Sequence, residues 1–134
     1  MFGRIAHIGI AVKDLQTSID LISRLLGTSL SHLEHVEDQQ VSTAMFSVGD
    51  TSIELLESVS PDSSIGKFIE KHGEGVHHIA VFVDNITEEL ERLRHEGFIL
   101  VDEQPRKGAD NCLVAFLHPK STNGVLIELS QKLE

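Results

Sequence analysis

Two hydrophobic patterns, alternating and helical, follow one another along this chain, and the same succession occurs twice. Each half opens with an extended apolar segment, "HIGIAVKDL" from His7 and "HIAVFVDNI" from His78. Apolar residues then recur at helical spacing over residues 15–26 and 86–96, and a glycine lies just beyond each segment. The runs "AMFSV" and "LVAFLH" follow as strand candidates. In each half the pattern predicts a strand, a helix and about three further strands.

The end of each half carries the same tripeptide. Residues 53–55 and 127–129 both read Ile-Glu-Leu, and the turn dipeptides Gly49-Asp50 and Asn123-Gly124 precede them at the same point of each half. Equivalent positions are separated by a nearly constant distance of about 70 residues, which indicates an internal duplication.

Each half has about 60 residues and would be marginal alone, so we expect the halves to share one core and a pseudo-twofold axis. The prediction is an α+β fold of two tandem βαβββ modules in a single domain over residues 1–134. Module 1 covers residues 1–60, a short helical connector covers 61–74, and module 2 covers 75–134.

Composition and charge argue against several classes of function. The 11 Lys and Arg against 21 Asp and Glu give a net charge of −10, and Trp and Tyr are absent, which argues against nucleic-acid binding. No apolar run approaches the roughly 20 residues of a membrane span, and the first residues do not resemble a secretory leader, so we expect a cytoplasmic protein. Cys112 is the single cysteine, which excludes an internal disulfide. The cluster Glu88, Glu89 and Glu91 is interpreted as a solvated helix face.

Two adjacent histidines open the second half, and at most one of them can face a given cavity because successive strand side chains point to opposite faces. His78 is the equivalent of His7 in the repeat, and both share a strand face with small residues. His77 is therefore interpreted as an outward or supporting residue. The histidines at positions 32, 35, 72 and 95 have no repeat partner and are interpreted as surface residues.

Glu54 and Glu128 form the second equivalent pair. Each interrupts an apolar strand, where a buried carboxylate is costly without a proton, a cationic partner or a metal. A single histidine at the start of a strand is more often a structural residue, and a single glutamate in an apolar strand more often faces solvent. Because both occur at equivalent positions in the two halves, a functional role is favoured. Two imidazoles and two carboxylates suit a borderline divalent ion. The sequence predicts one divalent ion per chain (cobalt, zinc, nickel or manganese), with the ligands His7, Glu54, His78 and Glu128.

These residues also carry a family resemblance. The paired βαβββ pattern with a His and a Glu from each half resembles the vicinal oxygen chelate superfamily, which includes glyoxalases and bleomycin resistance proteins. The segments "VGDTSIELLE", "GEGVHHIA" and "HPKSTNGVLIEL" resemble the methylmalonyl-CoA epimerase family, in that family's order, and the resemblance covers nearly the whole chain. It implies a cupped, partly closed mixed sheet around a metal, the same four ligands, and a homodimer.

The resemblance further implies an isomerase that interconverts the (R) and (S) epimers of methylmalonyl-CoA. The proton between the thioester and the carboxylate would be removed with the help of the metal, giving an enolate. Glu128 is the first choice for the base, and Glu54 is its counterpart on the opposite side. Thr43 stands where some epimerases carry a glutamate, so the identity of the two proton-transfer groups stays open.

Residues outside the ligand set are expected to hold the substrate. Gln39 is expected to hydrogen-bond it near the metal. Lys120, Arg106 and Lys107 are candidate cations for the coenzyme A phosphates against an acidic background.

Two other functions stay open. A glyoxalase I-like lactoylglutathione lyase uses similar ligands and related proton transfers, but "HPKSTNG" resembles the epimerase turn. A small-molecule binding or resistance protein of the same fold is the second alternative, and the duplicated His and Glu positions argue against its metal-free form.

Overall fold

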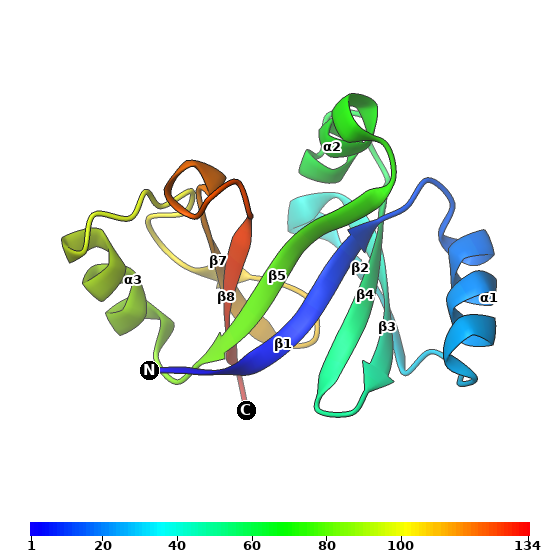
Figure 1. The fold of residues 1–134 in the computed structure, drawn as a ribbon, viewed down its shortest axis with the longest axis horizontal. Helices are drawn as coiled ribbons and strands as arrows, with labels where there is room; N and C mark the ends of the chain where they lie inside the picture. Colours follow the sequence, from blue (N-terminus) through cyan, green and yellow to red (C-terminus); the bar gives the residue numbers. More distant parts are fainter. The chain divides into compact units, whose positions relative to one another are not determined.

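The structure is a computed structural model that describes all 134 residues, and it confirms the paired α+β pattern. Each half contributes a strand, a helix and three strands, and a further helix joins the halves (Figure 1). The strands are β1 Phe2–Ala11, β2 His32–Val36, β3 Val41–Val48, β4 Thr51–Ser58, β5 Gly75–Val83, β6 Arg106–Lys107, β7 Cys112–Leu117 and β8 Ile127–Lys132. The helices are α1 Leu15–Leu26, α2 Ser64–His72 and α3 Ile86–His95, with short 3-10 turns η1 at Glu37–Gln39 and η2 at Pro119–Ser121.

The eight strands form a mixed sheet in the order β2-β3-β4-β1-β5-β8-β7-β6. By their contacts the residues group into two compact units. The first unit contains residues 1–7 and 78–134, and the second contains residues 8–77. Strands β1 and β5 contribute residues to both. The module boundaries expected from the repeat stay a prediction.

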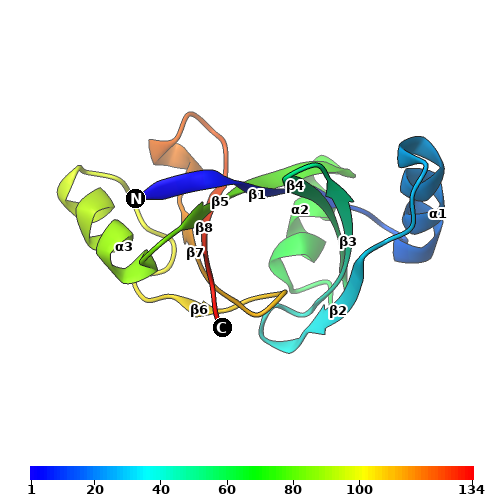
Figure 2. The same ribbon diagram turned by 90° about the horizontal axis from the view of Figure 1, so that it is seen from below.

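The second unit is built on antiparallel pairing of β2 with β3 and of β3 with β4. Gly49 and Asp50 form the two-residue turn between β3 and β4, and Gly49 adopts a φ of 62°, which favours glycine. Helix α1 lies beside β3 and β4 (Figures 1 and 2). The core between them consists of Val12, Leu15, Ile19, Ala44, Phe46 and Leu55.

In the first unit, β5 pairs with β8 in parallel, and β7 pairs with β8 and β6 in antiparallel fashion. Helix α3 packs on β7 and β8. The core of the first unit consists of Val83, Ile86, Leu90, Leu93, Ala115, Leu117 and Leu129. Asn123 and Gly124 both have positive φ, as expected of turn residues, but they lie in a longer β7–β8 connection because His118 and Pro119 first start the η2 turn. None of the three helices has the length and hydropathy needed to cross a membrane.

Asn85 caps the N-terminus of α3, since its side chain accepts a hydrogen bond from the Glu88 backbone N–H at 3.1 Å. Replacing Asn85 with alanine is expected to lower the free energy of unfolding by about 1 kcal/mol, because that N–H loses its partner. Thr87→Ala, an exposed change in the same first turn, is the matched control. Chemical denaturation measures both, and equal losses would contradict the capping role.

Glu89 corrects one expectation from the sequence. It is 6% exposed rather than solvated, and it accepts from the N-terminal ammonium at 2.6 Å and from the Arg92 Nε at 3.0 Å. Hydrogen bonding by the ammonium is the main cause that lowers the pKa of Glu89. The helical spacing from Ile86 to Leu93 places residue 89 on the buried face of α3, so periodicity outweighs polarity here.

Candidate metal centre

His7 and His78 come from β1 and β5 and are both buried, with 7% and 2% exposure. Alternation along each strand produces this burial: Gly9 and Ala80, two residues away, are buried, whereas Ile8 and Ile79 are only partly buried. The two Nε2 atoms lie 2.9 Å apart, and the rings meet edge to face with centroids 5.1 Å apart. Both imidazoles therefore present the same nitrogen to one point.

Glu128 on β8 brings a carboxylate to this point. It is 6% exposed, and its Oε1 lies 3.0 Å from the Nε2 of His78 and 3.7 Å from the Nε2 of His7. The parallel pairing of Ala80 with Glu128 positions it, because Ala80 shares a face with His78. Burial raises the pKa of Glu128, but hydrogen bonds and positive charge from His7 and His78 outweigh burial and lower the pKa from 4.5 to about 2. Glu128 is therefore a carboxylate at neutral pH.

The spacing of these three donors fits a divalent ion. Ligand atoms at about 2.1 Å from an ion and at right angles to one another lie about 3 Å apart, and somewhat farther apart in a tetrahedron. The observed separations run from 2.9 to 3.7 Å. Neutral imidazole and carboxylate are ligands that zinc and its neighbours in the first transition row accept. His7, His78 and Glu128 thus present three buried donor atoms at the spacing of the ligands of one ion, and we call them the His-Glu-His group.

Glu54 belongs to the second unit and lies in β4 opposite Met45 of β3. Its carboxylate is buried, with 4% exposure, between the apolar residues Ile53 and Leu55. Alternation places it on the face opposite Leu55, which packs into the core beneath α1. Its oxygen is among those that could serve as a metal ligand.

Thr43 is buried in β3 on the same face as Glu54. Its hydroxyl donates to the backbone carbonyl of Glu34 at 3.4 Å, and Glu34 is its cross-strand partner on β2. A threonine hydroxyl does not ionise near neutral pH, so this position supplies no carboxylate base.

His77 points away from the face of His78, as expected from alternation. It is half-buried, and its ring packs edge to face against Phe68 of α2 with centroids 4.9 Å apart. The histidines predicted to lie on the surface are all exposed, namely His32, His35, His72 and His95.

The two expected substrate-binding residues lie in the 3-10 turns. Gln39 is half-buried at the end of η1, in the second unit. Lys120 is exposed in η2, in the first unit, where its backbone N–H donates to the Nδ1 of His118 at 3.0 Å.

Phe116 is a site residue that the sequence reasoning missed. It lies on β7 directly opposite Glu128, and its ring packs edge to face on His78 with centroids 5.6 Å apart. It therefore fixes the orientation of that imidazole. The apolar run "LVAFLH" predicts the strand, but only the register of β7 against β8 identifies which residue faces Glu128.

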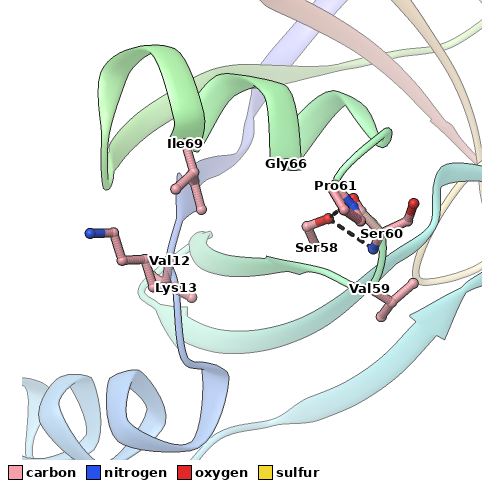
Figure 3. Close-up of a pocket in the computed structure, with 8 residues that line it drawn as sticks. All are labelled: Val12, Lys13, Ser58, Val59, Ser60, Pro61, Gly66 and Ile69. Atoms are coloured by element: carbon pink, nitrogen blue, oxygen red, sulfur yellow. Dashed lines mark hydrogen bonds between the residues drawn. The ribbon is translucent and has the colours of Figure 1, made fainter.

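Each unit also has a hollow of its own. The hollow of the second unit is about 340 Å³ and lies between α2, the loop before it and the end of β1 (Figure 3). The Ser58 hydroxyl in its wall is satisfied internally, by the Ser60 N–H at 3.0 Å and the Ser63 hydroxyl at 2.6 Å. The hollow of the first unit is about 430 Å³ and is lined by Gly3, Arg4, Phe82, Val83, Asp84, Gln131 and Lys132. None of the predicted site residues lines either hollow.

Comparison with known proteins identifies a family and several relatives of this chain. The family model described as the glyoxalase/bleomycin resistance protein/dioxygenase superfamily matches residues 6–116. Methylmalonyl-CoA epimerase from Dictyostelium discoideum is 37% identical over 131 residues, which cover 97% of this chain and 79% of the relative. Lactoylglutathione lyase from Escherichia coli O157:H7 is a more distant relative, with 29% identity over 96% of this chain and 93% of its own length.

Solved structures with a similar fold include proteins of the same name as the first of these relatives. The crystal structure of methylmalonyl-CoA epimerase from Mycobacterium tuberculosis is 36% identical and has a TM-score of 0.93, covering 98% of this chain and 89% of that one. A methylmalonyl-CoA epimerase in complex with methylmalonyl-CoA and NH4+ gives the same identity and TM-score and covers 98% and 96% of the two chains. From the family match, the strand order and the similarity over nearly its full length, this chain belongs to the glyoxalase/bleomycin resistance protein/dioxygenase superfamily.

Proposed function

We propose that this chain is a metal-dependent methylmalonyl-CoA epimerase, which interconverts the (R) and (S) epimers of its substrate. The observation that carries the proposal is the buried group of His7, His78 and Glu128, found in a chain whose relatives are named methylmalonyl-CoA epimerases. Buried ionisable groups that converge on one point are typical of functional sites, and here one of them, Glu128, has a strongly lowered pKa.

One divalent ion per chain is part of the proposal, and its ligands are His7, Glu54, His78 and Glu128. The equivalence of Glu54 and Glu128 in the repeat and the burial of both carboxylates support the fourth ligand. An ion held by these residues would supply positive charge beside the thioester and carboxylate oxygens of the substrate, where negative charge develops as carbon 2 loses its proton. Cobalt, zinc, nickel and manganese all suit this donor set.

Glu128 and Glu54 are proposed to move the proton. Glu128 is ionised at neutral pH, as a base must be before it accepts a proton. Inversion requires a proton to leave one face of carbon 2 and another to arrive on the opposite face, so two groups are needed. The pseudo-symmetric placement of the two glutamates in the repeat supports this pair, and the hydroxyl of Thr43 does not replace either of them.

The remaining expectations belong to the same proposal. Gln39 hydrogen-bonds the substrate, and Lys120 approaches the coenzyme A phosphates as an exposed cation. The protein works as a homodimer, an expectation that rests on the family resemblance, and the cytoplasm is its expected compartment. Analytical ultracentrifugation tests the dimer.

The function is tested by giving the metal-loaded protein two substrates in separate reactions. One is a single epimer of methylmalonyl-CoA, and the other is the hemithioacetal of methylglyoxal and glutathione. Inversion of the malonyl thioester is expected to be at least about 100-fold faster than lactoyl thioester formation, because each chemistry needs its own placement of proton-transfer groups. Turnover of the hemithioacetal alone would assign the chain to the lyases.

A further inference from the structure

The hollow of the first unit lies at the end of β5, between the neighbouring strands β1 and β8. Strand β5 lies between these two strands in the sheet and ends at Val83. Both termini of the chain lie at this end of the unit (Figure 1). The hollow has a volume of about 430 Å³, and its lining comes from all three strands and from Asp84, which follows β5.

Two of the lining residues, Phe82 and Lys132, belong to the strand face that carries the His-Glu-His group. Phe82 is four residues beyond His78 on β5, and Lys132 is four residues beyond Glu128 on β8. Side chains separated by an even number of residues point to the same face of a strand. One face of the first unit therefore leads along two adjacent strands from the His-Glu-His group to the hollow.

The hollow carries positive charge in an acidic protein. The Cζ of Arg4 lies 4.8 Å from the centre of the Phe82 ring, and this stacking holds the guanidinium in place at the hollow. The Nζ of Lys132 lies 3.6 Å from an oxygen of Asp110, but its side chain is 63% exposed, and so open an ion pair contributes little. Asp84 is the one acidic residue of the lining, so the lining keeps one net positive charge in a chain of net charge −10.

We infer that this hollow binds the diphosphate of an acyl-CoA whose acyl group is held at the His-Glu-His group, with Arg4 and Lys132 as its cations. The inference rests on the proposed function, from which it takes the class of ligand. Four residues of β8 span about 14 Å, which is the distance along the strand from Glu128 to Lys132. About fourteen bonds separate the thioester carbon from the nearer phosphorus, a reach of about 16 Å in extended form. The pantetheine arm is therefore long enough to place the diphosphate at the hollow, where two cations meet it.

The cations named from the sequence compete less well for the diphosphate. The Nε of Arg106 is buried and lies 3.4 Å from Oδ1 of Asp102, so this arginine already has an ionic partner. Lys120 lies before the start of β8, whereas Lys132 lies at its end. An acyl-CoA that extends from Glu128 along β8 reaches only one of these two lysines, and the experiment below separates them.

Two ligands, racemic methylmalonyl-CoA and racemic methylmalonyl-pantetheine, test this contact when each is titrated into metal-loaded protein in a calorimeter. The pantetheine thioester lacks the phosphates, and inversion leaves a racemic mixture unchanged, so the heat reports binding alone. Arg4→Ala and Lys132→Ala are each expected to weaken binding of the coenzyme A thioester by about 10-fold, because a charged contact is lost. Binding of the pantetheine thioester is expected to change by less than about 2-fold, since it offers no phosphate to either cation.

Two further variants keep the result interpretable. Arg4→Met retains an apolar stem against Phe82 and is expected to show the same ligand dependence if the alanine variant folds poorly. Arg94→Ala is the matched control, since Arg94 is an ion-paired arginine of the same unit with 41% side-chain exposure. It is expected to leave the affinity for both thioesters unchanged.

The pattern of affinities distinguishes the outcomes. Equal weakening with both thioesters, or no weakening with either, would overturn the inference, and so would a loss in Lys120→Ala without one in Arg4→Ala. Unaltered protein that binds neither thioester would overturn the inference and the proposed function together. The expected pattern of binding in a protein that fails to invert a single epimer would support the hollow as the diphosphate site and overturn only the proposed function.

Discussion

Replacing Glu128 with glutamine is expected to lower the rate of epimerisation by about 10²- to 10⁴-fold, the range that a positioned general base contributes. Glutamine preserves the size of the side chain and one oxygen, but it accepts no proton near neutral pH. His7 and His78 favour the ionised form of Glu128, and the substitution removes this negative charge from the site. Conversion of one epimer to the other, followed by chiral analysis, measures the effect.

Glu89→Gln is the matched control for this substitution. Glu89 is also a glutamate of the first unit with 6% exposure, but its partners are the N-terminal ammonium and Arg92 rather than histidines. We expect lower stability without loss of the per-molecule rate. An equal loss of rate in both variants would mean that Glu128 acts through folding and not through proton transfer.

His78→Ala is expected to abolish tight metal binding, whereas His77→Ala is expected to retain one equivalent per chain. The two histidines are adjacent, yet the Nε2 of His78 lies 2.9 Å from that of His7, while the ring of His77 packs on Phe68. Alanine at position 78 offers no donor atom, so the substitution removes one of the two imidazole ligands of the proposed set and should weaken ion binding sharply.

Metal analysis and thermal unfolding measure this difference. An ion that binds only the folded protein stabilises it by mass action, so adding the ion should raise the Tm of the unaltered protein and of His77→Ala, and chelation should lower it. His78→Ala should show neither shift. Full metal content in His78→Ala together with loss in His77→Ala would contradict the assignment of faces along β5.

The positions of His7, His78 and Glu128 could be predicted from the sequence because they depend on two local properties. Strand alternation decides which of two adjacent histidines faces inward, and the repeat identifies the equivalent residue elsewhere in the chain. Both properties can be recognised in the sequence without knowledge of long-range packing. The three side chains are buried, as these properties predict.

Arg106 and Phe116 could not be placed in the same way. Strand β6 contains only two residues, too few for an alternating pattern, and its register against β7 depends on long-range pairing. The sequence identified Arg106 as a cation but not the face on which it lies. The prediction that Glu89 lies on a solvated helix face was wrong for a different reason, because it gave the charge of the residue more weight than its position in the helix.

Deuterium incorporation at carbon 2 of methylmalonyl-CoA tests the central claim most directly. Incubation of one epimer with metal-loaded protein in deuterated water should give the other epimer with deuterium at carbon 2, since proton removal and return pass through groups that exchange with solvent. Glu128→Gln should slow both inversion and exchange. Inversion without deuterium, or neither inversion nor exchange in protein shown to contain its metal, would contradict epimerisation by proton transfer at the His-Glu-His group.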